Sequence, residues 1–212
     1  MDDKPASRKR DSHATRKRIL AAAKKEFAKK GFGGARIDEI ALKSKANKRM
    51  IYHYFGNKEA LFLKTLEDAY IDIRSAEQGL NLTALDPEEA LITLVKFTWN
   101  YYLKNPEFIT LVNSENLHRA KHLKKSQIIE DISVKFNSMV GAILDKGVAT
   151  GQFRQGIDPV QLNITIAAIG YYYLTNRYTG AIVYQRDLDS KSAYEERLNF
   201  NIETILKLVR AP

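Results

Sequence analysis

The chain has 212 residues, 44% of them apolar, which is enough for one ordinary domain or two modest ones with a buried core. It contains no cysteine, which excludes disulfides and cysteine-based metal sites and is compatible with a reducing cytoplasm. Its formal net charge is +9 at neutral pH.

The positive charge is concentrated near the N-terminus. Residues 1–58 hold 17 lysines and arginines against 6 acidic residues, a net charge of +11. The remaining residues hold 17 lysines and arginines against 19 acidic residues, a net charge of −2. A basic segment joined to a near-neutral body favours a nucleic-acid partner for the segment, with an anionic membrane surface or a merely solvated basic face as the alternatives.

No targeting or membrane-spanning segment is visible in the sequence. The first eighteen residues are charged and polar and lack the apolar core of a secretory signal. The most apolar run, residues 164–174, is shorter than the roughly 20 residues that a spanning helix needs. We therefore expect a soluble, cytoplasmic protein without a membrane partner.

Apolar periodicity and capping residues predict an all-α fold with about nine helices. Residues 1–12 lack apolar periodicity and are predicted to form a flexible basic arm. A helix follows from Thr15 to Gly31, where glycine stops it. The remaining helices are predicted over residues 36–44, 48–55, 58–78, 87–104, 106–118, 126–147, 159–178 and 190–209.

Residues 36–55 have the pattern of a helix-turn-helix. The first short helix is predicted to face inward through Ile37, Ile40 and Ala41. The second is predicted to face inward through Ile51 and Phe55, which are four residues apart. Asn47 has the side chain to cap the second helix. This helix leaves basic and aromatic side chains outward, which suits a DNA major groove. The alternative is a helical hairpin with a solvated basic face.

Three stretches of the chain resemble the TetR family of bacterial regulators. They are residues 15–23 with Phe27 and Gly31-Phe32, then Ile37-Asp38-Glu39-Ile40-Ala41, and then residues 51–62. The third is close to the family's hallmark, an aromatic-rich recognition helix that runs into an Asn-Lys-Glu helix start. The match covers about residues 13–66, and residues 105–108, 113–118 and 156–159 resemble one widespread C-terminal subtype.

The chain departs from this family's usual pattern at two places. The family's turn is usually Ala-Gly-Val-Ser, whereas this chain has Ser44-Lys45-Ala46-Asn47. The glycine permits a positive φ, so Lys45 is more costly if that geometry persists, although it can offer a phosphate contact instead. Arg36 stands where the family often has threonine.

The resemblance implies a DNA-binding domain over residues 13–60. The residues that it implies for phosphate contacts are Arg36, Lys45, Asn47, Tyr54 and Lys58. The residues that it implies for base edges are Lys48, Arg49, Tyr52 and His53. A core aromatic remains the alternative for Tyr54.

The resemblance also implies that residues 61–212 form a ligand-binding and dimerisation domain. Helices at about 159–178 and 190–209 would pair with their copies in a homodimer, which suits a palindromic operator. The expected function is a dimeric repressor that a small-molecule effector releases from double-stranded operator DNA. Aromatic and polar residues that crowd together are candidates for the effector site, although each aromatic alone could be ordinary core. They are Phe97, Tyr101, Phe108, Asn113, Asn116, His118, Tyr172 and Asn176.

Glu115, His118 and His122 have a spacing that could place them on one helical face as metal ligands. We expect instead a surface histidine beside a carboxylate, and neither a metal nor a cofactor. No Ser/His/Asp set, paired acids or phosphate loop is apparent, so we do not expect an enzyme. A transcriptional activator and a DNA-binding protein without a sensor remain alternatives.

Overall fold

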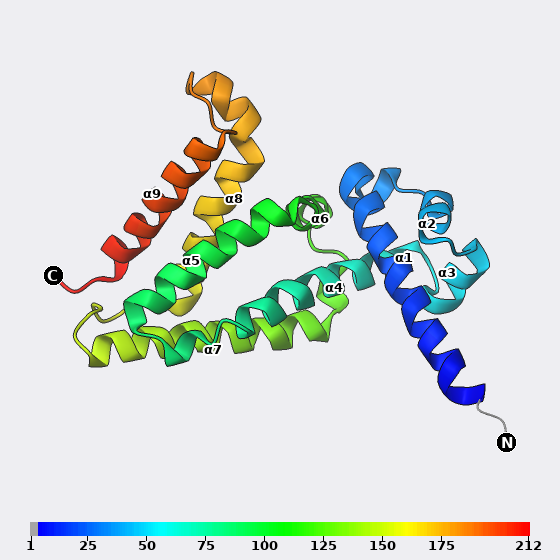
Figure 1. Ribbon diagram of the computed structural model, residues 1–212, viewed down its shortest axis with the longest axis horizontal. Helices are drawn as coiled ribbons and strands as arrows, with labels where there is room; N and C mark the ends of the chain where they lie inside the picture. Colours follow the sequence, from blue (N-terminus) through cyan, green and yellow to red (C-terminus); the bar gives the residue numbers. More distant parts are fainter. Residues whose placement is uncertain (1–3) are drawn as a thin grey trace. The chain divides into compact units, whose positions relative to one another are not determined.

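The computed structural model describes the backbone of residues 4–212 and the side chains from Ser12 onward. Over these residues the chain is helical, with one isolated β-bridge between Phe153 and Arg210 and no strand. The α-helices are α1 (Lys4–Gly34), α2 (Ile37–Ser44), α3 (Lys48–Phe55), α4 (Lys58–Gln78), α5 (Pro87–Lys104), α6 (Pro106–Leu117), α7 (Gln127–Ala149), α8 (Pro159–Val183) and α9 (Lys191–Val209) (Figure 1). Two short 3-10 helices are η1 (Leu82–Ala84) and η2 (Leu123–Lys125). The predicted all-α class is confirmed for this part of the chain.

The two largest differences between predicted and observed helix boundaries are the start of α1 and the end of α8. α1 begins at Lys4, inside the segment predicted as a basic arm, and residues 1–3 of that arm lie outside the described residues. α8 continues to Val183 and not only to Tyr178; no proline interrupts it, and Gly180 is buried within the helix. The predicted stop at Gly31 is visible as a φ of 64° that interrupts the helical geometry of α1.

Capping residues start the helices of the C-terminal half. Asp86 and Asp158 each accept a hydrogen bond from a backbone N–H in the first turn of the helix that follows, and each precedes a proline. Ser190 caps α9 by accepting from the N–H of Ala193 at 3.3 Å. A cap and a following proline satisfy or remove N–H groups that a helix start leaves unpaired.

The chain divides into two compact units. One holds the chain up to Ile71 together with Glu107–Ile129, and the other holds Asp72–Pro106 with Glu130–Pro212. The first unit therefore includes α6 and η2 as well as the three N-terminal helices. The predicted domain bounds, 13–60 and 61–212, stay a prediction.

An aromatic cluster lies in the core of the first unit. The ring of Phe62 on α4 lies 4.9 Å from that of Phe27 and 5.2 Å from that of Phe32, both on α1. His122 adds its ring at 5.0 Å from Phe62 and 4.8 Å from Phe32. This packing ties α1, α4 and the segment after α6 together around one core.

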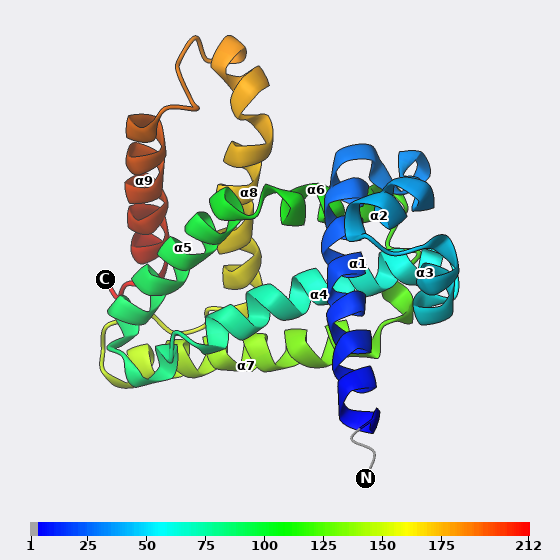
Figure 2. The same cartoon turned by 45° about the vertical axis from the view of Figure 1, so that its right-hand side comes forward.

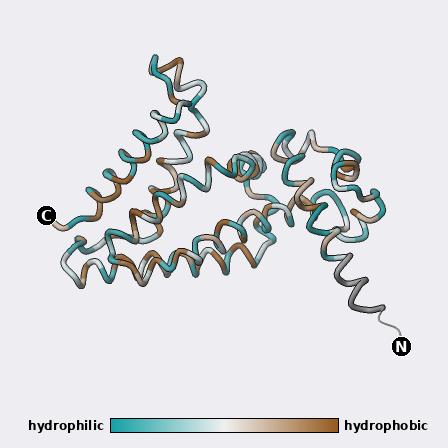
Figure 3. Tube along the Cα trace, in the orientation of Figure 1, coloured by the Kyte–Doolittle hydropathy of each residue, from teal (hydrophilic) through white to brown (hydrophobic). Residues whose placement is uncertain are grey.

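The core of the second unit is aliphatic. In Figure 3 hydrophobic and hydrophilic segments alternate along α5 and α7, as amphipathic helices require. The buried side chains of this core come from α5, α7, α8 and α9 and include Leu91, Leu94, Val140, Ile143, Leu162, Ile166, Ile205 and Val209. Among the helices of the described residues, none combines the length and the hydropathy needed to cross a membrane.

Candidate DNA interface

α2 and α3 form a helix-turn-helix on one side of α1 (Figures 1 and 2). Ile40 and Ala41 of α2 are buried, as are Ile51 and Phe55 of α3. The inward faces predicted from the sequence are therefore confirmed at these four residues, whereas Ile37, also predicted to face inward, is only half-buried. Because Ile51 and Phe55 hold one side of α3 in the core, the opposite side of that helix faces solvent.

The connection between α2 and α3 has a left-handed residue. Lys45 has φ 53° and ψ 36°, so the positive φ expected at this turn is kept although the residue is not glycine. The N–H of Ala46 donates to the carbonyl of Ala41 at 3.0 Å and closes the end of α2. Asn47 then caps α3, accepting from the N–H of Met50 at 2.8 Å.

The solvent-facing side of α3 carries the predicted base-reading residues. Lys48, Arg49, Tyr52 and His53 are all exposed, Tyr52 to 46% of its surface. Tyr54 is half-buried, and its ring packs 5.4 Å from that of His53. Tyr54 therefore lies at the edge of this face, and its phosphate contact stays a prediction.

Lys48 forms an ion pair across the two helices. Its ammonium contacts the carboxylate of Asp38 on α2, and both side chains are more than half exposed. Exposed pairs of this kind contribute little to stability. A phosphate can therefore compete with Asp38 for Lys48 at small cost.

A buried carboxylate holds α2 against α1. Glu26 of α1 is fully buried and receives Lys43 of α2 at 2.6 Å and Lys30 of its own helix at 2.9 Å. Burial by itself raises the pKa of Glu26, but the hydrogen bonds from Lys43 and Lys30 outweigh it and lower the pKa to about 2. This ion triad fixes the helix that supports the recognition helix.

Two cations meet near the start of α4. Asn57 caps this helix by accepting from a first-turn N–H at 2.8 Å, as predicted. The ammonium of Lys58 lies 5.0 Å from the centre of the Phe32 ring and donates to the carbonyl of Gly33 at 3.5 Å. Burial, and then the positive charge of Arg36, lower the pKa of Lys58. Like charges this close, beside a helix N-terminus, favour an anion such as a DNA phosphate.

Four of the predicted effector residues lie in the first unit. The ring of Phe108 packs 5.4 Å from that of Tyr70. Asn113 and Asn116 are exposed, and Nδ1 of His118 lies 2.7 Å from a backbone carbonyl one turn earlier. None of the four lines the cavity described below.

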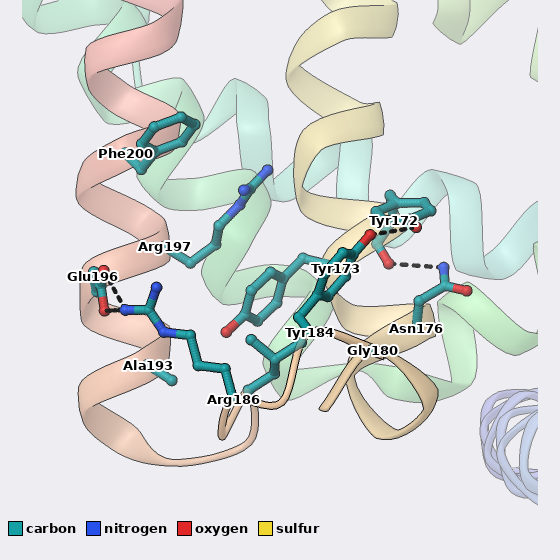
Figure 4. A pocket seen from close by; sticks show the side chains of 11 residues that line it. Tyr172, Tyr173, Asn176, Gly180, Tyr184, Arg186, Ala193, Glu196, Arg197 and Phe200 are labelled. Carbon is teal, nitrogen blue, oxygen red and sulfur yellow. Dashed lines mark hydrogen bonds and ion pairs between the residues drawn. The ribbon is translucent and has the colours of Figure 1, made fainter. Parts of the chain in front are cut away.

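The other four predicted effector residues lie in the second unit. The rings of Phe97 and Tyr101 are 5.7 Å apart, and the Tyr101 hydroxyl donates to Asp72 at 2.7 Å. Tyr172 and Asn176 line a cavity of about 620 Å³ between α8 and α9 (Figure 4). The structure thus brings only two of the eight together in this cavity.

Sequence reasoning missed the charged residues of this cavity. Arg186, Glu196 and Arg197 also line it. Arg197 lies one turn before Phe200 on α9 and outside the apolar stripe of that helix, so no local pattern identifies it.

Glu115, His118 and His122 do not form a metal site. Among the described residues, no group of three such side chains is placed to hold a metal ion. We expected a surface histidine beside a carboxylate. This was wrong for His122, because His122 and Glu115 are each exposed over 2% of their surface or less. Glu115 instead accepts from the backbone N–H groups of His122 and Leu123, at 2.7 and 3.0 Å, and pairs with Nδ1 of His122 at 2.7 Å. The carboxylate is fully used in closing the turn after α6.

Comparisons with known proteins agree with this architecture. The family model described as "Bacterial regulatory proteins, tetR family" matches residues 19–65, and the one described as "Tetracyclin repressor-like, C-terminal domain" matches residues 87–205. The chain is 40% identical over 207 residues to the HTH-type transcriptional repressor NicS of Pseudomonas putida, covering 98% of each chain.

Two solved structures have the same fold. A TetR family transcription regulator from Marinobacter aquaeolei superposes with a TM-score of 0.73 at 18% identity, over 97% of this chain and 100% of that one. FadR from Bacillus subtilis, solved in complex with stearoyl-CoA, superposes with a TM-score of 0.65 at 17% identity, over 89% of this chain and 96% of that one. These two likenesses show the fold alone, and the family models and the NicS match carry the assignment. The chain belongs to the TetR family of bacterial regulatory proteins.

Proposed function

We propose that this chain is a dimeric, cytoplasmic transcriptional repressor that binds operator DNA and is released by a small-molecule effector. The observation that carries the proposal is the outward face of α3, where Lys48, Arg49, Tyr52 and His53 stand exposed while Ile51 keeps the helix anchored. A short helix anchored in this way, with basic and aromatic groups outward, fits the major groove.

The side chains around α3 divide into two roles in this proposal. Lys48, Arg49, Tyr52 and His53 read base edges, with Arg49 suited to the two acceptors of guanine. Phosphate contacts come from the turn and from the starts of the neighbouring helices, through Arg36, Lys45, Asn47, Tyr54 and Lys58. Phosphate contacts set the register of the protein on DNA and contribute most of the salt dependence of binding.

The dimer is proposed to form through α8 and α9. Large apolar side chains on these two helices are exposed, among them Ile164 to 56%, Ile182 to 80% and Phe200 to 58%. Exposed apolar surface of this kind marks an interaction face. A two-fold dimer presents two copies of α3 to the two halves of a palindromic operator.

The effector is proposed to act by shifting a population between two arrangements of the dimer. A ligand that binds more tightly to the arrangement that fits the operator poorly lowers the affinity of the dimer for DNA. The ratio of the ligand's affinities for the two arrangements limits the size of this effect. Two comparisons support this mechanism: NicS is named a transcriptional repressor, and FadR was solved with a bound acyl-CoA.

The test is a mobility-shift titration of the purified chain on DNA from its own promoter region, with scrambled DNA of equal length as the competitor. We expect a sequence-selective shift, and a dimer by light scattering. Equal binding to both DNAs would contradict operator recognition, and a monomer at working concentration would contradict the α8–α9 dimer.

A further inference from the structure

The cavity between α8 and α9 has a chemistry that points to one class of ligand. It lies within the second unit, where the C-terminal part of α8, the connecting loop and the first half of α9 surround about 620 Å³ (Figure 4). This volume falls in the range of about 300–1,000 Å³ typical of small-molecule sites. Three tyrosines, Tyr172, Tyr173 and Tyr184, and Phe200 give it aromatic walls.

The two arginines of the cavity are in different situations. Arg186 is paired with Glu196, whose two carboxylate oxygens accept from the same guanidinium nitrogen at 2.7 and 2.6 Å. For Arg197 no ion pair is present within the described residues, and one of its terminal nitrogens donates to the carbonyl of Ile169 at 3.4 Å. The charged residues of the cavity wall therefore leave one positive charge uncompensated.

Arg197 is held in place by two ring contacts. Its guanidinium lies 5.4 Å from the centre of the Tyr173 ring and 5.3 Å from that of Phe200. Nε of Arg197 is buried and has no hydrogen-bond partner among the described residues. Burial lowers the pKa of Arg197, although a guanidinium remains protonated at neutral pH.

An uncompensated guanidinium beside a cavity attracts an anion. Carboxylate and phosphate oxygens accept charge-assisted hydrogen bonds from the terminal nitrogens of arginine, and these bonds are stronger than those between neutral groups. The aromatic side chains around Arg197 suit an apolar or planar body attached to the anionic group. A neutral ligand of the same shape would leave the positive charge of Arg197 uncompensated.

We propose that this cavity is the effector site and that it takes a small organic anion whose carboxylate or phosphate binds Arg197. This inference rests on the proposed effector-released repressor and names the chemical class of its effector. Because the cavity is bounded by α8 and α9, the helices of the proposed dimer, a ligand between them alters the surface that the two copies share.

The experiment measures anion preference on the full-length chain. The probes are benzoate, octanoate and phenyl phosphate, each beside a neutral counterpart: benzamide, octanamide and phenol. Binding is followed by calorimetry and by the shift in Tm. We expect at least one anion to bind more tightly than its neutral counterpart by about tenfold or more. If no anion is preferred over its counterpart, the proposal is overturned without any need for a variant.

Two variants assign the preference to Arg197. Arg197→Gln is expected to abolish the preference and to leave operator binding and the dimer intact. The control R186Q/E196Q removes the paired charges of the same cavity and is expected to keep the preference. An R197Q protein that keeps the preference overturns the assignment. An R197Q protein that is monomeric overturns it as well, because Arg197 would then belong to the contact between copies.

The outcome for the proposed function is read separately. Operator binding by the ligand-free chain is measured on the same preparations. If the chain selects no operator DNA while Arg197 still confers anion preference, the repressor proposal fails and the anion site stands. If operator binding is present and no anion is preferred, only the anion site fails.

Discussion

The carboxylate of Glu26 on α1 lies 2.6 Å from the ammonium of Lys43 on α2 and is itself fully buried. A buried charge that is satisfied by two lysines stabilises the native arrangement only while it is ionised. Removing one partner of such a pair leaves the other as a buried charge without a counter-charge, which is destabilising. The position of α2, and with it the support of α3, therefore depends on the protonation state of one carboxyl group.

Glu26→Gln should destabilise the chain in a pH-dependent way. The folded pKa, about 2, is below the ordinary 4.5, so the stabilisation is complete above pH 4.5 and is lost as the pH falls toward 2. We expect E26Q to lower the free energy of unfolding by about 2 kcal/mol at pH 7, and the difference from the native chain to shrink between pH 4.5 and 2. Urea denaturation at a series of pH values measures this. The control is E39Q, since Glu39 lies 4.0 Å from Lys43 and is exposed; equal effects of the two changes would contradict the role of burial.

Substitutions of Lys45 should separate backbone geometry from DNA contact. A left-handed φ of 53° strains lysine and alanine alike but not glycine. We expect Lys45→Gly to raise the free energy of unfolding by about 1 kcal/mol and Lys45→Ala to leave it nearly unchanged. Both substitutions remove the positive charge, so both should weaken DNA binding. Both should also reduce, by about 1, the slope of the logarithm of the DNA-binding constant against the logarithm of the salt concentration, which we call the salt slope.

Denaturation curves and mobility shifts at several salt concentrations measure the two effects of Lys45 independently. A K45A protein with the native salt slope would show that Lys45 does not contact a phosphate. A K45G protein no more stable than K45A would show that the strain is relieved elsewhere in the turn.

Features that depend on a few neighbouring residues could be predicted from the sequence. The four-residue spacing of Ile51 and Phe55 gives the buried side of α3, and the side chains of Asn47 and Asn57 reach N–H groups three residues ahead. These interactions lie within one helical turn, so local pattern is sufficient. For Lys45 the resemblance gave only a condition, namely a costly residue if the geometry of the family's glycine persists, and the structure shows that it does persist.

Features that depend on distant contacts could not be predicted. Glu26 meets Lys43 across 17 residues of chain, and no spacing rule indicates that pairing. The spacings of Glu115, His118 and His122 resemble a metal site. The predicted end of the helix before His122 was correct, but no local pattern indicated that the Glu115 carboxylate accepts from backbone N–H groups of the following turn. For the cavity around Arg197, the register between α8 and α9 decides which side chains meet, and apolar periodicity leaves that register open.

Gly147 and Gly141 of α7 should respond in opposite directions to alanine. A Cβ at Gly147 would fall within the ring of Phe153, which is buried in the core of the second unit. A Cβ at Gly141 would meet only Pro159, at an ordinary 3.8 Å. We expect Gly147→Ala to cost about 1–3 kcal/mol and Gly141→Ala to stabilise by roughly 0.5–1 kcal/mol through helix propensity. Thermal denaturation compares them. A neutral G147A would contradict the close packing of Phe153 on Gly147, and a destabilised G141A would contradict the free space beside Gly141.

Glu77 should make the chain less stable as the pH rises. Burial raises its pKa to about 7 although the charge of Arg74 and a hydrogen bond from it act in the opposite direction. Since the folded pKa is above the ordinary 4.5, stability is complete below pH 4.5 and falls as the pH rises through 7. We expect Glu77→Gln to remove this decline, which amounts to no more than about 3.5 kcal/mol at roughly 1.4 kcal/mol per pKa unit. The readout is the slope of unfolding free energy from pH 5 to 8, and parallel slopes for both proteins would contradict the prediction.

Arg49 and Lys58 should affect DNA binding in different ways. Arg49 stands exposed on α3, where a bidentate contact to guanine is worth about 1–3 kcal/mol of discrimination. Arg49→Ala should therefore weaken operator binding while binding to scrambled DNA stays nearly unchanged. Lys58, beside the start of α4, is proposed to contact a phosphate, so Lys58→Ala should weaken binding to both DNAs alike and reduce the salt slope by about 1.

Because Lys58 also packs on Phe32, the melting temperature of K58A must first be shown to match that of the native chain. Titrations of both variants against operator and scrambled DNA at several salt concentrations give the comparison. If R49A loses affinity equally for the two DNAs, Arg49 binds the backbone and the base-reading role passes to Lys48, Tyr52 or His53. If K58A lowers affinity for the operator alone, Lys58 acts through the orientation of α3, because a phosphate contact cannot discriminate between sequences.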